Sequence, residues 1–315
     1  MKYATLTLNP ALDKTMYFNK FDEGILNRAE GSNLALGSKG INVSRIFNIL
    51  GEQCRAIAFC GGYNGRIMQQ IANSESLPYE FIETRAETRM NVKIIETSTG
   101  ICTECNELGG PITPDEYAEL GASIERAFSE IEYLFLGGSV PKGIDPMIYS
   151  RLIKSGKSKG VKVILDCDGA ALRDGVEHSP YMIKPNLFEL EHLCGKELNL
   201  ERLGDGSVSE ASIKSICQIC MQIHEKYNTK VLCTMSGDGA IYAGEEGTFY
   251  QSAPKVTLRG FAGAGDTFLA TFIYKYTADA GDCAEALKFA ASAAAAKVEL
   301  EGTTLPTRDA MGKFL

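Results

Sequence analysis

One segment of the sequence combines an anion-binding backbone with a carboxylate. Gly263, Ala264 and Gly265 precede Asp266, and residues 267–272 form a largely apolar run that can start a helix. Small residues let successive backbone N–H groups approach an anion, and the amino end of a helix adds roughly half a positive charge. A carboxylate at such a site can accept a proton from an attacking hydroxyl group, but aspartate is equally common as a helix cap. The residue types alone leave both roles open for Asp266.

A second glycine-containing segment also leads into a predicted helix. Residues 37–45 read Gly-Ser-Lys-Gly-Ile-Asn-Val-Ser-Arg, which lacks the spacing of a triphosphate-binding P-loop. Lys39 can bind a phosphate as a point charge, although most lysines are simply solvated. The first segment has Phe268 where a dinucleotide-binding fingerprint requires its third glycine. The sequence therefore favours phosphate binding without a P-loop, and it gives no support to hydride transfer.

The elements that must position these segments alternate between short apolar strands and helices. We expect strands at 3–8, 55–60, 133–136, 161–165, 181–183 and 231–235, and helices near 41–50, 64–76, 115–129, 146–159, 211–227, 265–279 and 284–297. Such alternation predicts a parallel sheet covered by helices on both faces. Two segments interrupt it, 13–33 and 89–108, and the second is a predicted hairpin around residues 98–100. Because ligands of such sheets bind at the carboxyl ends of the strands, we interpret both segments as a small β-sheet lid on a single domain, 1–315.

Composition and charge exclude several classes of protein. The chain has 315 residues, of which 44% are hydrophobic and 23% charged, so it can bury a substantial core. Its 32 basic and 40 acidic residues give a net charge of -8, which provides no broad cationic face for nucleic acid or anionic lipid. Polar residues and a proline break the first ten residues before a signal peptide can form. We expect a cytoplasmic protein that binds neither nucleic acid nor a membrane.

These motifs together resemble the ribokinase-like (PfkB) sugar-kinase family over essentially the whole chain. Besides the two glycine-containing segments, the resemblance covers Thr-Leu-Asn-Pro-Ala-Leu-Asp at 7–13, Glu-Thr-Arg-Met-Asn-Val-Lys at 87–93, Gly-Ser-Val-Pro at 138–141, Lys-Pro-Asn-Leu-Phe-Glu at 184–189 and Glu-Gly-Thr at 301–303. Segments 7–13, 37–43 and 87–93 are similar to the hexose-phosphate branch of the family. Ser38, Ser236 and Phe261 depart from the family pattern, which leaves the identity of the sugar open.

The resemblance implies a fold and a reaction. The fold is a three-layer α/β/α sandwich with a mainly parallel central sheet and a β-sheet lid. The reaction is ATP- and Mg²⁺-dependent phosphorylation of a ketohexose phosphate, with fructose 1-phosphate as the first choice and tagatose 6-phosphate or fructose 6-phosphate as alternatives. A nucleoside or ribose kinase, a non-catalytic sugar-phosphate sensor and dependence on a monovalent cation also stay open. The family often forms homodimers through the lid, and we expect one here.

The resemblance also assigns roles to residues of this chain. Asp266 is the base that deprotonates the sugar, and its N–H group joins those of Ala264 and Gly265 around the transferring phosphoryl group. Gly263 is expected in the same catalytic segment. The expected sugar-phosphate site consists of Asp13 and Asn42 at the hydroxyl groups, Lys39, Arg89, Arg28 and Lys93 at the phosphate, and Gly37 and Ser139. Asn186 and Glu189 are expected to organise Mg²⁺ through water. The expected nucleotide site also includes Lys184, Thr234, Ser236, Gly237 and Ser292.

Overall fold

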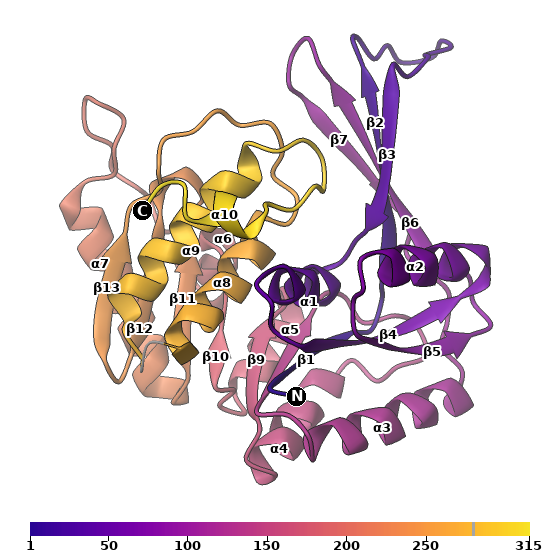
Figure 1. Ribbon diagram of the computed structural model, residues 1–315. Coiled ribbons are helices and arrows are strands. Elements are labelled where there is room, and N and C mark those ends of the chain that lie inside the picture. The colour runs from indigo at the N-terminus through magenta and orange to yellow at the C-terminus, as the bar shows by residue number, and fades with distance from the viewer. Residues whose placement is uncertain (279–280) are drawn as a thin grey trace.

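The computed structural model describes residues 1–278 and 281–315, and its main feature is a large twisted sheet (Figure 1). In the described residues this sheet has the strand order β13-β12-β11-β10-β9-β8-β1-β4-β5. All neighbouring strands from β5 to β11 pair in parallel, and β12 and β13 continue the sheet in antiparallel fashion. The strands are β1 (Tyr3–Thr7), β4 (Cys54–Gly61), β5 (Tyr79–Thr84), β8 (Tyr133–Gly137), β9 (Lys162–Asp166), β10 (Met182–Ile183), β11 (Lys230–Thr234), β12 (Ala240–Gly244) and β13 (Gly247–Gln251). The predicted, mainly parallel central sheet is confirmed.

Side chains on the two faces of the sheet enter separate hydrophobic cores. In β8, Tyr133 and Phe135 belong to one core, whereas Leu134 and Leu136 belong to the other. This follows from the alternation of side chains along a strand, and it explains why β8 reads as a continuous apolar run. A strand of this type needs helices on both sides.

Helices cover each face of the sheet (Figure 1). One core includes residues of α3 (Pro114–Phe128), α4 (Ile148–Ser158), α5 (Gly169–Val176), α6 (Leu187–Cys194) and α7 (Glu210–Tyr227). The other includes residues of α1 (Lys39–Ile49), α8 (Ala264–Ala278), α9 (Cys283–Val298) and α10 (Arg308–Met311), and α2 (Gly62–Ser74) packs on a smaller cluster beside β4. The seven predicted helices are present. The last residue of the predicted helix 265–279 lies outside the described residues.

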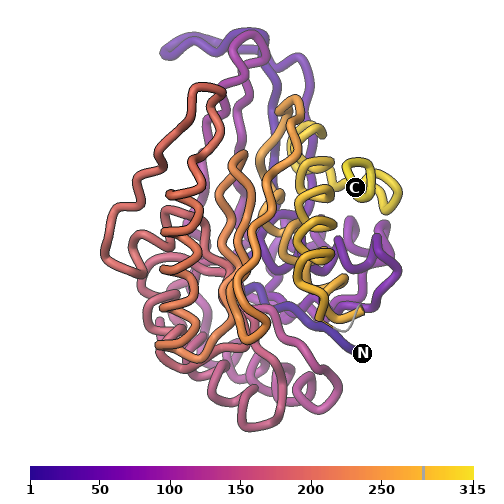
Figure 2. Tube along the Cα trace, turned by 90° about the vertical axis from the view of Figure 1, so that its left-hand side faces the viewer, coloured from indigo at the N-terminus to yellow at the C-terminus, as the bar shows by residue number. Residues whose placement is uncertain are grey.

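A second, four-stranded sheet rises from the body as a lid (Figures 1 and 2). Its order is β3-β2-β6-β7, with β2 (Ala11–Phe18), β3 (Gly31–Leu36), β6 (Arg89–Glu96) and β7 (Cys102–Asn106). The predicted hairpin is the antiparallel pair β6–β7, and Gly100 adopts a φ of 74° in its turn. The strands extend slightly beyond the predicted segment 13–33, because β2 pairs with β6 along its whole length from Ala11.

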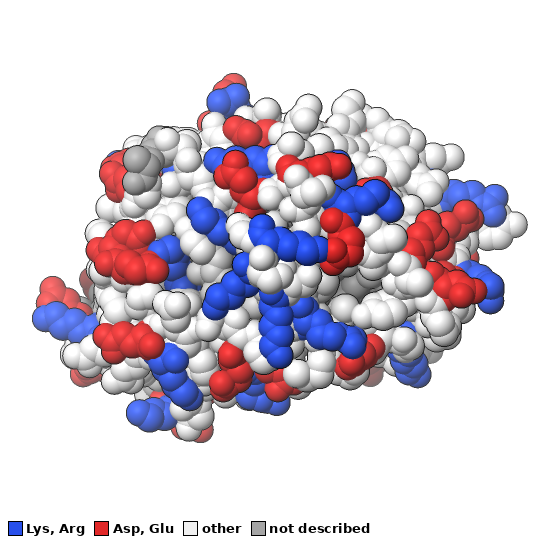
Figure 3. All heavy atoms as spheres, turned by 90° about the horizontal axis from the view of Figure 1, so that it is seen from below, with Lys and Arg blue, Asp and Glu red and all other residues white. Residues whose placement is uncertain are grey.

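On the face opposite the lid, basic side chains gather near the middle and acidic ones flank them (Figure 3). Among the described residues, no helix is both long and apolar enough to cross a membrane.

Candidate active site

Several of the predicted site residues meet where the parallel strands end. Asp166 is the last residue of β9, Thr234 is the last residue of β11, and Lys184 directly follows β10. The amino end of α8 carries Asp266 to the same place, where Asn42 of α1 reaches it. This is the position at which open α/β sheets bind ligands.

Asp266 is a buried carboxylate in the first turn of α8. Its side chain is 7% exposed, and its Oδ2 accepts a hydrogen bond of 2.8 Å from Nδ2 of Asn42. Burial raises the pKa of Asp266 to about 6, Asp166 adds to this shift, and the Asn42 bond and two lysines oppose it. Gly263 has a φ of 82°, a backbone conformation that favours glycine, and it turns the chain into the helix. The carboxylate is therefore ionised at neutral pH and lies beside a backbone that can bind an anion.

Two lysines share the carboxylate of Asp166. Nζ of Lys39 lies 2.7 Å and Nζ of Lys184 lies 3.4 Å from its Oδ1. Burial alone would raise the pKa of Asp166, but the two ammonium groups lower it. A methyl group at Gly265 would lie 3.7 Å from Nζ of Lys184, so this ammonium lies beside the anion-binding backbone. Sequence reasoning missed Asp166, and its only signal was its place at the end of an apolar strand.

The structure places Lys39 with the carboxylates. Besides its bond to Asp166, Nζ of Lys39 lies 4.0 Å from Oε1 of Glu189. Burial works against the charged form, but Asp166 and Glu189 raise the pKa of Lys39 above its usual value. None of its hydrogen bonds reaches the group around Arg89, with which it was expected to share the sugar phosphate. Its binding of that phosphate stays a prediction.

Asn186 and Glu189 form a capping box at the start of α6. The backbone N–H of Asn186 donates to Oε2 of Glu189, and the backbone N–H of Glu189 donates to Oδ1 of Asn186, each at 2.8 Å. Within the described part of the chain, no three His, Cys, Asp or Glu side chains cluster as a metal site. Mg²⁺ normally keeps several waters and takes only one or two carboxylates together with substrate phosphates. The buried Oδ2 of Asp166 has no hydrogen-bond partner, so this donor set fits a Mg²⁺ ion held largely through water.

A largely apolar cavity of about 380 Å³ adjoins the amino end of α8. Thr234, Ser236 and Gly237 line it, as predicted for a nucleotide site, and Gly265 borders it as well. Its apolar walls come from the segment 253–261 and from one face of α9, and their residues are Ala253, Pro254, Val256, Leu258, Phe261, Ala291, Ala294, Ala295 and Val298. A pocket of this size and character suits the base of a nucleotide.

Ser292, which was expected at the nucleotide site, does not line this cavity. It is fully buried on another face of α9, and its hydroxyl group donates to the carbonyl of Met311 at 2.7 Å and accepts from the backbone N–H of Phe314 at 3.0 Å. Both bonds tie α9 to the C-terminal segment. Alanines of α9 line the cavity instead, because one face of the helix borders the cavity and another face contacts the C-terminal segment.

The lid contributes an acidic side chain whose position is closely fixed. Asp13 of β2 accepts hydrogen bonds of 2.9 Å from Lys93 and from Asn91, both on the neighbouring strand β6. The register between β2 and β6 explains both hydrogen bonds. Asp13 pairs with Asn91, and Lys93 lies two residues farther along β6 on the same face of the sheet. A methyl group at Gly37 would lie 2.3 Å from Oδ1 of Asp13, so only glycine allows this approach. Lys93 is thus paired with Asp13, and its binding of the sugar phosphate stays a prediction.

A second polar group lies at the base of the lid. Arg89 donates from Nε to the carbonyl of Asn9 at 3.1 Å and from Nη1 to Oδ1 of Asn91 at 2.7 Å. The amide of Asn9 in turn donates to Oγ of the exposed Ser139 at 3.0 Å. Nη2 of Arg89 has no acceptor among the described residues, which leaves one edge of the guanidinium for a phosphate. Arg28 is exposed in the loop between β2 and β3, and its binding of the sugar phosphate stays a prediction.

Sequence comparisons relate the chain to known kinases. A sequence model described as pfkB family carbohydrate kinase matches residues 6–310. The chain is 31% identical over 273 residues to a 1-phosphofructokinase of Borreliella burgdorferi, a match that covers 86% of this chain and 84% of the relative. It is 29% identical over 269 residues to a 1-phosphofructokinase of Bacillus subtilis, which covers 85% of this chain and 84% of that protein.

Structural comparison supports the same fold. A crystal structure of phosphofructokinase-2 from Escherichia coli in complex with substrates and products has a TM-score of 0.90 at 24% identity, and it covers 100% of this chain and 98% of that chain. A structure of ribokinase from Arabidopsis thaliana, complexed with ribose and ATP, has a TM-score of 0.73 at 19% identity and covers 100% and 99% of the two chains. At these identities the likeness concerns the fold alone.

Proposed function

The chain belongs to the pfkB family of carbohydrate kinases, and from this premise we propose that it transfers the γ-phosphoryl group of ATP to fructose 1-phosphate. The product would be fructose 1,6-bisphosphate. The observation that carries the proposal is the buried Asp266 carboxylate, ionised at neutral pH, at the amino end of α8 beside Lys184. The preference for fructose 1-phosphate rests on the two relatives at about 30% identity.

In the proposed mechanism, Asp266 accepts the proton of the attacking sugar hydroxyl. The oxygen of that hydroxyl forms a bond to the γ-phosphorus as the bond to the β-phosphate oxygen of ATP breaks, and ADP leaves. The N–H groups of residues 264–266 and the ammonium group of Lys184 stabilise the charge on the transferring phosphoryl group. Asn42 holds the carboxylate in place, so the base needs no rearrangement before it acts.

The lid side of the site would hold the sugar phosphate. We place its sugar hydroxyl groups at Asp13, Gly37 and Asn42, and its phosphate at the free edge of Arg89 and the hydroxyl of Ser139. The hydroxyl that reacts and the phosphate already present lie at opposite ends of fructose 1-phosphate.

Mg²⁺ would enter with the nucleotide. Asn186 and Glu189 would hold it through water near Asp166, and the bound ion would neutralise charge on the phosphates of ATP. Lys39 and Lys184 supply further positive charge from the chain itself. Dependence on a monovalent cation stays a prediction.

We further propose one kinase domain over 1–315 that acts in the cytoplasm as a homodimer paired through the lid. The ten cysteines of the chain are all free, which suits a reducing compartment. Large apolar side chains of the lid segments are exposed, namely Ile25, Leu26, Ile101 and Leu108. Pairing with a second copy would cover them.

A coupled assay that follows ADP production across fructose 1-phosphate, fructose 6-phosphate, tagatose 6-phosphate and ribose tests the proposed reaction. We expect the highest kcat/KM with fructose 1-phosphate. Arg89→Gln should raise KM for the sugar phosphate about 10- to 100-fold, because a charge-assisted hydrogen bond contributes about 1.5–3 kcal/mol, and it should leave KM for ATP unchanged. Turnover of ribose with no effect of Arg89→Gln would indicate a kinase of neutral sugars, and no turnover of any compound would indicate a sensor.

A further inference from the structure

One lysine is completely buried close to the site and has no role in the mechanism above. Lys297 lies in the last turn of α9 and is 0% exposed. Its ammonium group donates to the carbonyl oxygen of Gly302 at 3.1 Å, and no carboxylate lies within salt-bridge distance among the residues that the structure describes. Lysine is almost never fully buried without a partner, so this position needs an explanation.

Lys297 contacts the first glycine of the anion-binding segment. A methyl group at Gly263 would lie 3.8 Å from Cε of Lys297 and 3.6 Å from Nδ2 of Asn42. Gly263 therefore lies between this lysine and the amide that holds Asp266. A change in the lysine can reach the reacting groups through this single residue.

The loop 300–302, which Lys297 binds, also packs against residues 259–260, just before the anion-binding segment 263–266. A methyl group at Gly260 would lie 2.7 Å from the carbonyl oxygen of Leu300 and 3.1 Å from that of Gly302. The backbone N–H groups of Arg259 and Gly260 both donate to the carbonyl of Val298, at 2.7 and 3.2 Å. Segment 259–263 is thus packed against the end of α9 and the loop 300–302.

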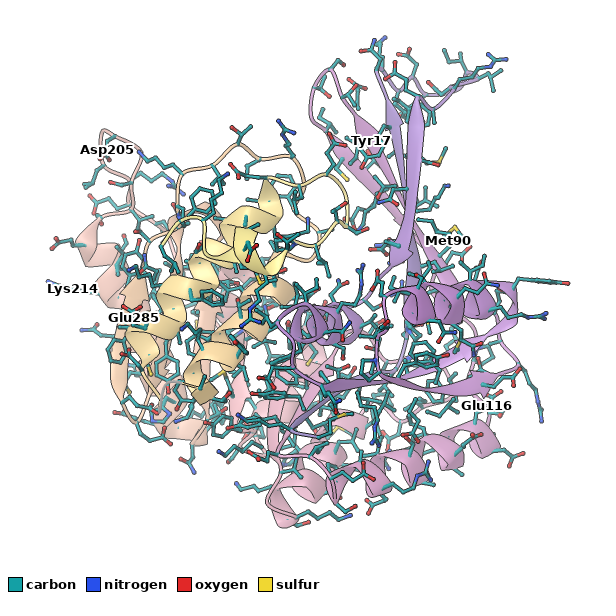
Figure 4. The ribbon with its side chains drawn as sticks, in the orientation of Figure 1. Tyr17, Met90, Glu116, Asp205, Lys214 and Glu285 are labelled. Atoms are coloured by element: carbon teal, nitrogen blue, oxygen red, sulfur yellow. The ribbon has the colours of Figure 1, made fainter. Side chains whose placement is uncertain are left out.

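The same loop faces the lid. A methyl group at Gly302 would lie 3.0 Å from the hydroxyl oxygen of Tyr17 and 3.3 Å from Oγ1 of Thr15. Figure 4 shows Tyr17 on the lid. The hydroxyl groups of Thr15 and Thr303 are buried and have no hydrogen-bond partner. The ammonium of Lys297 therefore lies in a polar layer between the lid and the anion-binding segment.

The charged groups around this layer come from three elements. Burial and the Lys93 ammonium on β6 together lower the pKa of Lys297 to about 8, although Asp266 on α8 opposes this shift. Lys93 is itself paired with Asp13, and burial raises the pKa of Tyr17, as does Glu301. Lys297 is therefore mostly charged at pH 7 and loses its proton just above that pH.

We propose that Lys297 is a positioning residue whose buried ammonium acts as an internal cation, holding the loop 300–302 against segment 259–263 so that the anion-binding backbone and Asp266 stay aligned for phosphoryl transfer. This inference rests on the proposed function, because it assigns Lys297 a part in that reaction. A purely structural lysine would stabilise the end of α9 without affecting turnover of the folded enzyme.

The first test is a steady-state comparison of Lys297→Met with Lys288→Met, a matched change at an exposed lysine of the same helix. We expect Lys297→Met to lower kcat on the order of tenfold, as losses of groups that support reactive residues do, with KM for both substrates within about twofold of wild type. Ammonium ions should restore part of the rate of Lys297→Ala, because they can enter the space of the missing amine. A folded Lys297→Met enzyme with wild-type kcat would overturn the proposal.

A second measurement, the pH profile of the wild-type enzyme, tests the proposal even if Lys297→Met fails to fold. In the wild-type enzyme, kcat/KM should fall as the pH rises through about 8, while circular dichroism shows that the protein stays folded. In a folded Lys297→Met enzyme this fall should be absent, and the activity should lie near the level that wild type approaches at high pH. A wild-type profile that stays flat up to pH 9.5 would contradict the role of Lys297. Wild-type enzyme inactive on every sugar phosphate at pH 7 would instead contradict the proposed function, and the inference with it.

Discussion

At the scale of single residues, the reactivity of Asp266 comes from its surroundings. Burial raises its pKa to about 6, which strengthens the carboxylate as a base while leaving it ionised at neutral pH. A general base works best when its pKa lies near the operating pH. The hydrogen bond from Asn42 opposes the shift and also fixes the orientation of the group.

This pKa predicts how activity depends on pH on the acidic side. The base must be ionised to accept a proton, so kcat/KM of the wild-type enzyme should decrease as the pH falls through about 6, tenfold for each further unit. Rates from pH 4.5 to 7.5 with fructose 1-phosphate check this, with unfolding followed in parallel. A midpoint below pH 4.5 would mean that Asp266 is not desolvated when it acts.

The sequence predicted the chemical type of these residues better than their partners. The glycines before Asp266 and the strand-end positions of Lys184 and Thr234 follow from local pattern. The bond between Lys39 and Asp166 joins residues 127 apart, and that between Asn42 and Asp266 joins residues 224 apart. No local pattern indicates such a pair, which is why Asp166 and Lys297 were missed.

At the scale of elements, short glycine-containing segments bring the lid and the body together. Gly37 directly follows β3 in the short connection to α1, and it packs directly on the carboxylate of Asp13. Ser38, the next residue, adopts a φ of 85°, in a region that disfavours side chains. Such backbone strain is concentrated at ligand sites in other proteins, and here it occurs between the lid and the first helix.

Gly37→Ala should therefore damage the sugar site selectively. The added methyl group would lie 2.3 Å from Oδ1 of Asp13, so the carboxylate must move away from the sugar. We expect kcat/KM for the sugar phosphate to fall at least on the order of tenfold, since a displacement of about 1 Å can cost a hundredfold, while KM for ATP changes little.

The matched control for this change is Gly121→Ala in α3. A methyl group at Gly121 meets nothing within 4 Å, and alanine favours a helix by about 0.5–1 kcal/mol. The control should keep wild-type kinetics and unfold at a slightly higher temperature. Equal kinetics for Gly37→Ala and Gly121→Ala would show that Asp13 does not contact the sugar.

The elements that the sequence missed are short or lack a clear apolar pattern. α5 and α6 have only eight residues each, and β13 alternates between partly buried and exposed residues. The long helices and the buried parallel strands were found because periodicity accumulates over their length. The capping box of Asn186 and Glu189 was visible as a spacing but was interpreted only as a metal-binding pattern.

At the scale of the whole molecule, the lid is a sheet with two free edges. In the described structure β3 and β7 lie at the edges, and β7 is exposed along its whole length. Edge strands tend to pair unless they are protected, and Ile25 and Leu26 nearby are 66% and 73% exposed. The lid accordingly presents apolar surface that one chain does not cover.

Light scattering at micromolar concentration should give the mass of a dimer. Replacing Ile25 with Lys and Leu26 with Glu should shift the protein toward the monomer and lower activity, because the lid would lose its support. The exposed pair Tyr63→Lys and Phe188→Glu, on α2 and α6, is the control and should stay dimeric. A monomeric wild type would contradict pairing through the lid.

The central claim is that Asp266 deprotonates the sugar hydroxyl, and the turnover of Asp266→Asn tests it most directly. Asparagine keeps the size of the side chain but cannot accept the proton, so kcat with fructose 1-phosphate should fall about 10²- to 10⁴-fold. Titration calorimetry should show ATP binding close to that of wild type, and the exposed Asp115→Asn should behave as wild type in both measurements. An Asp266→Asn enzyme that retains more than about a tenth of the wild-type kcat would contradict the claim.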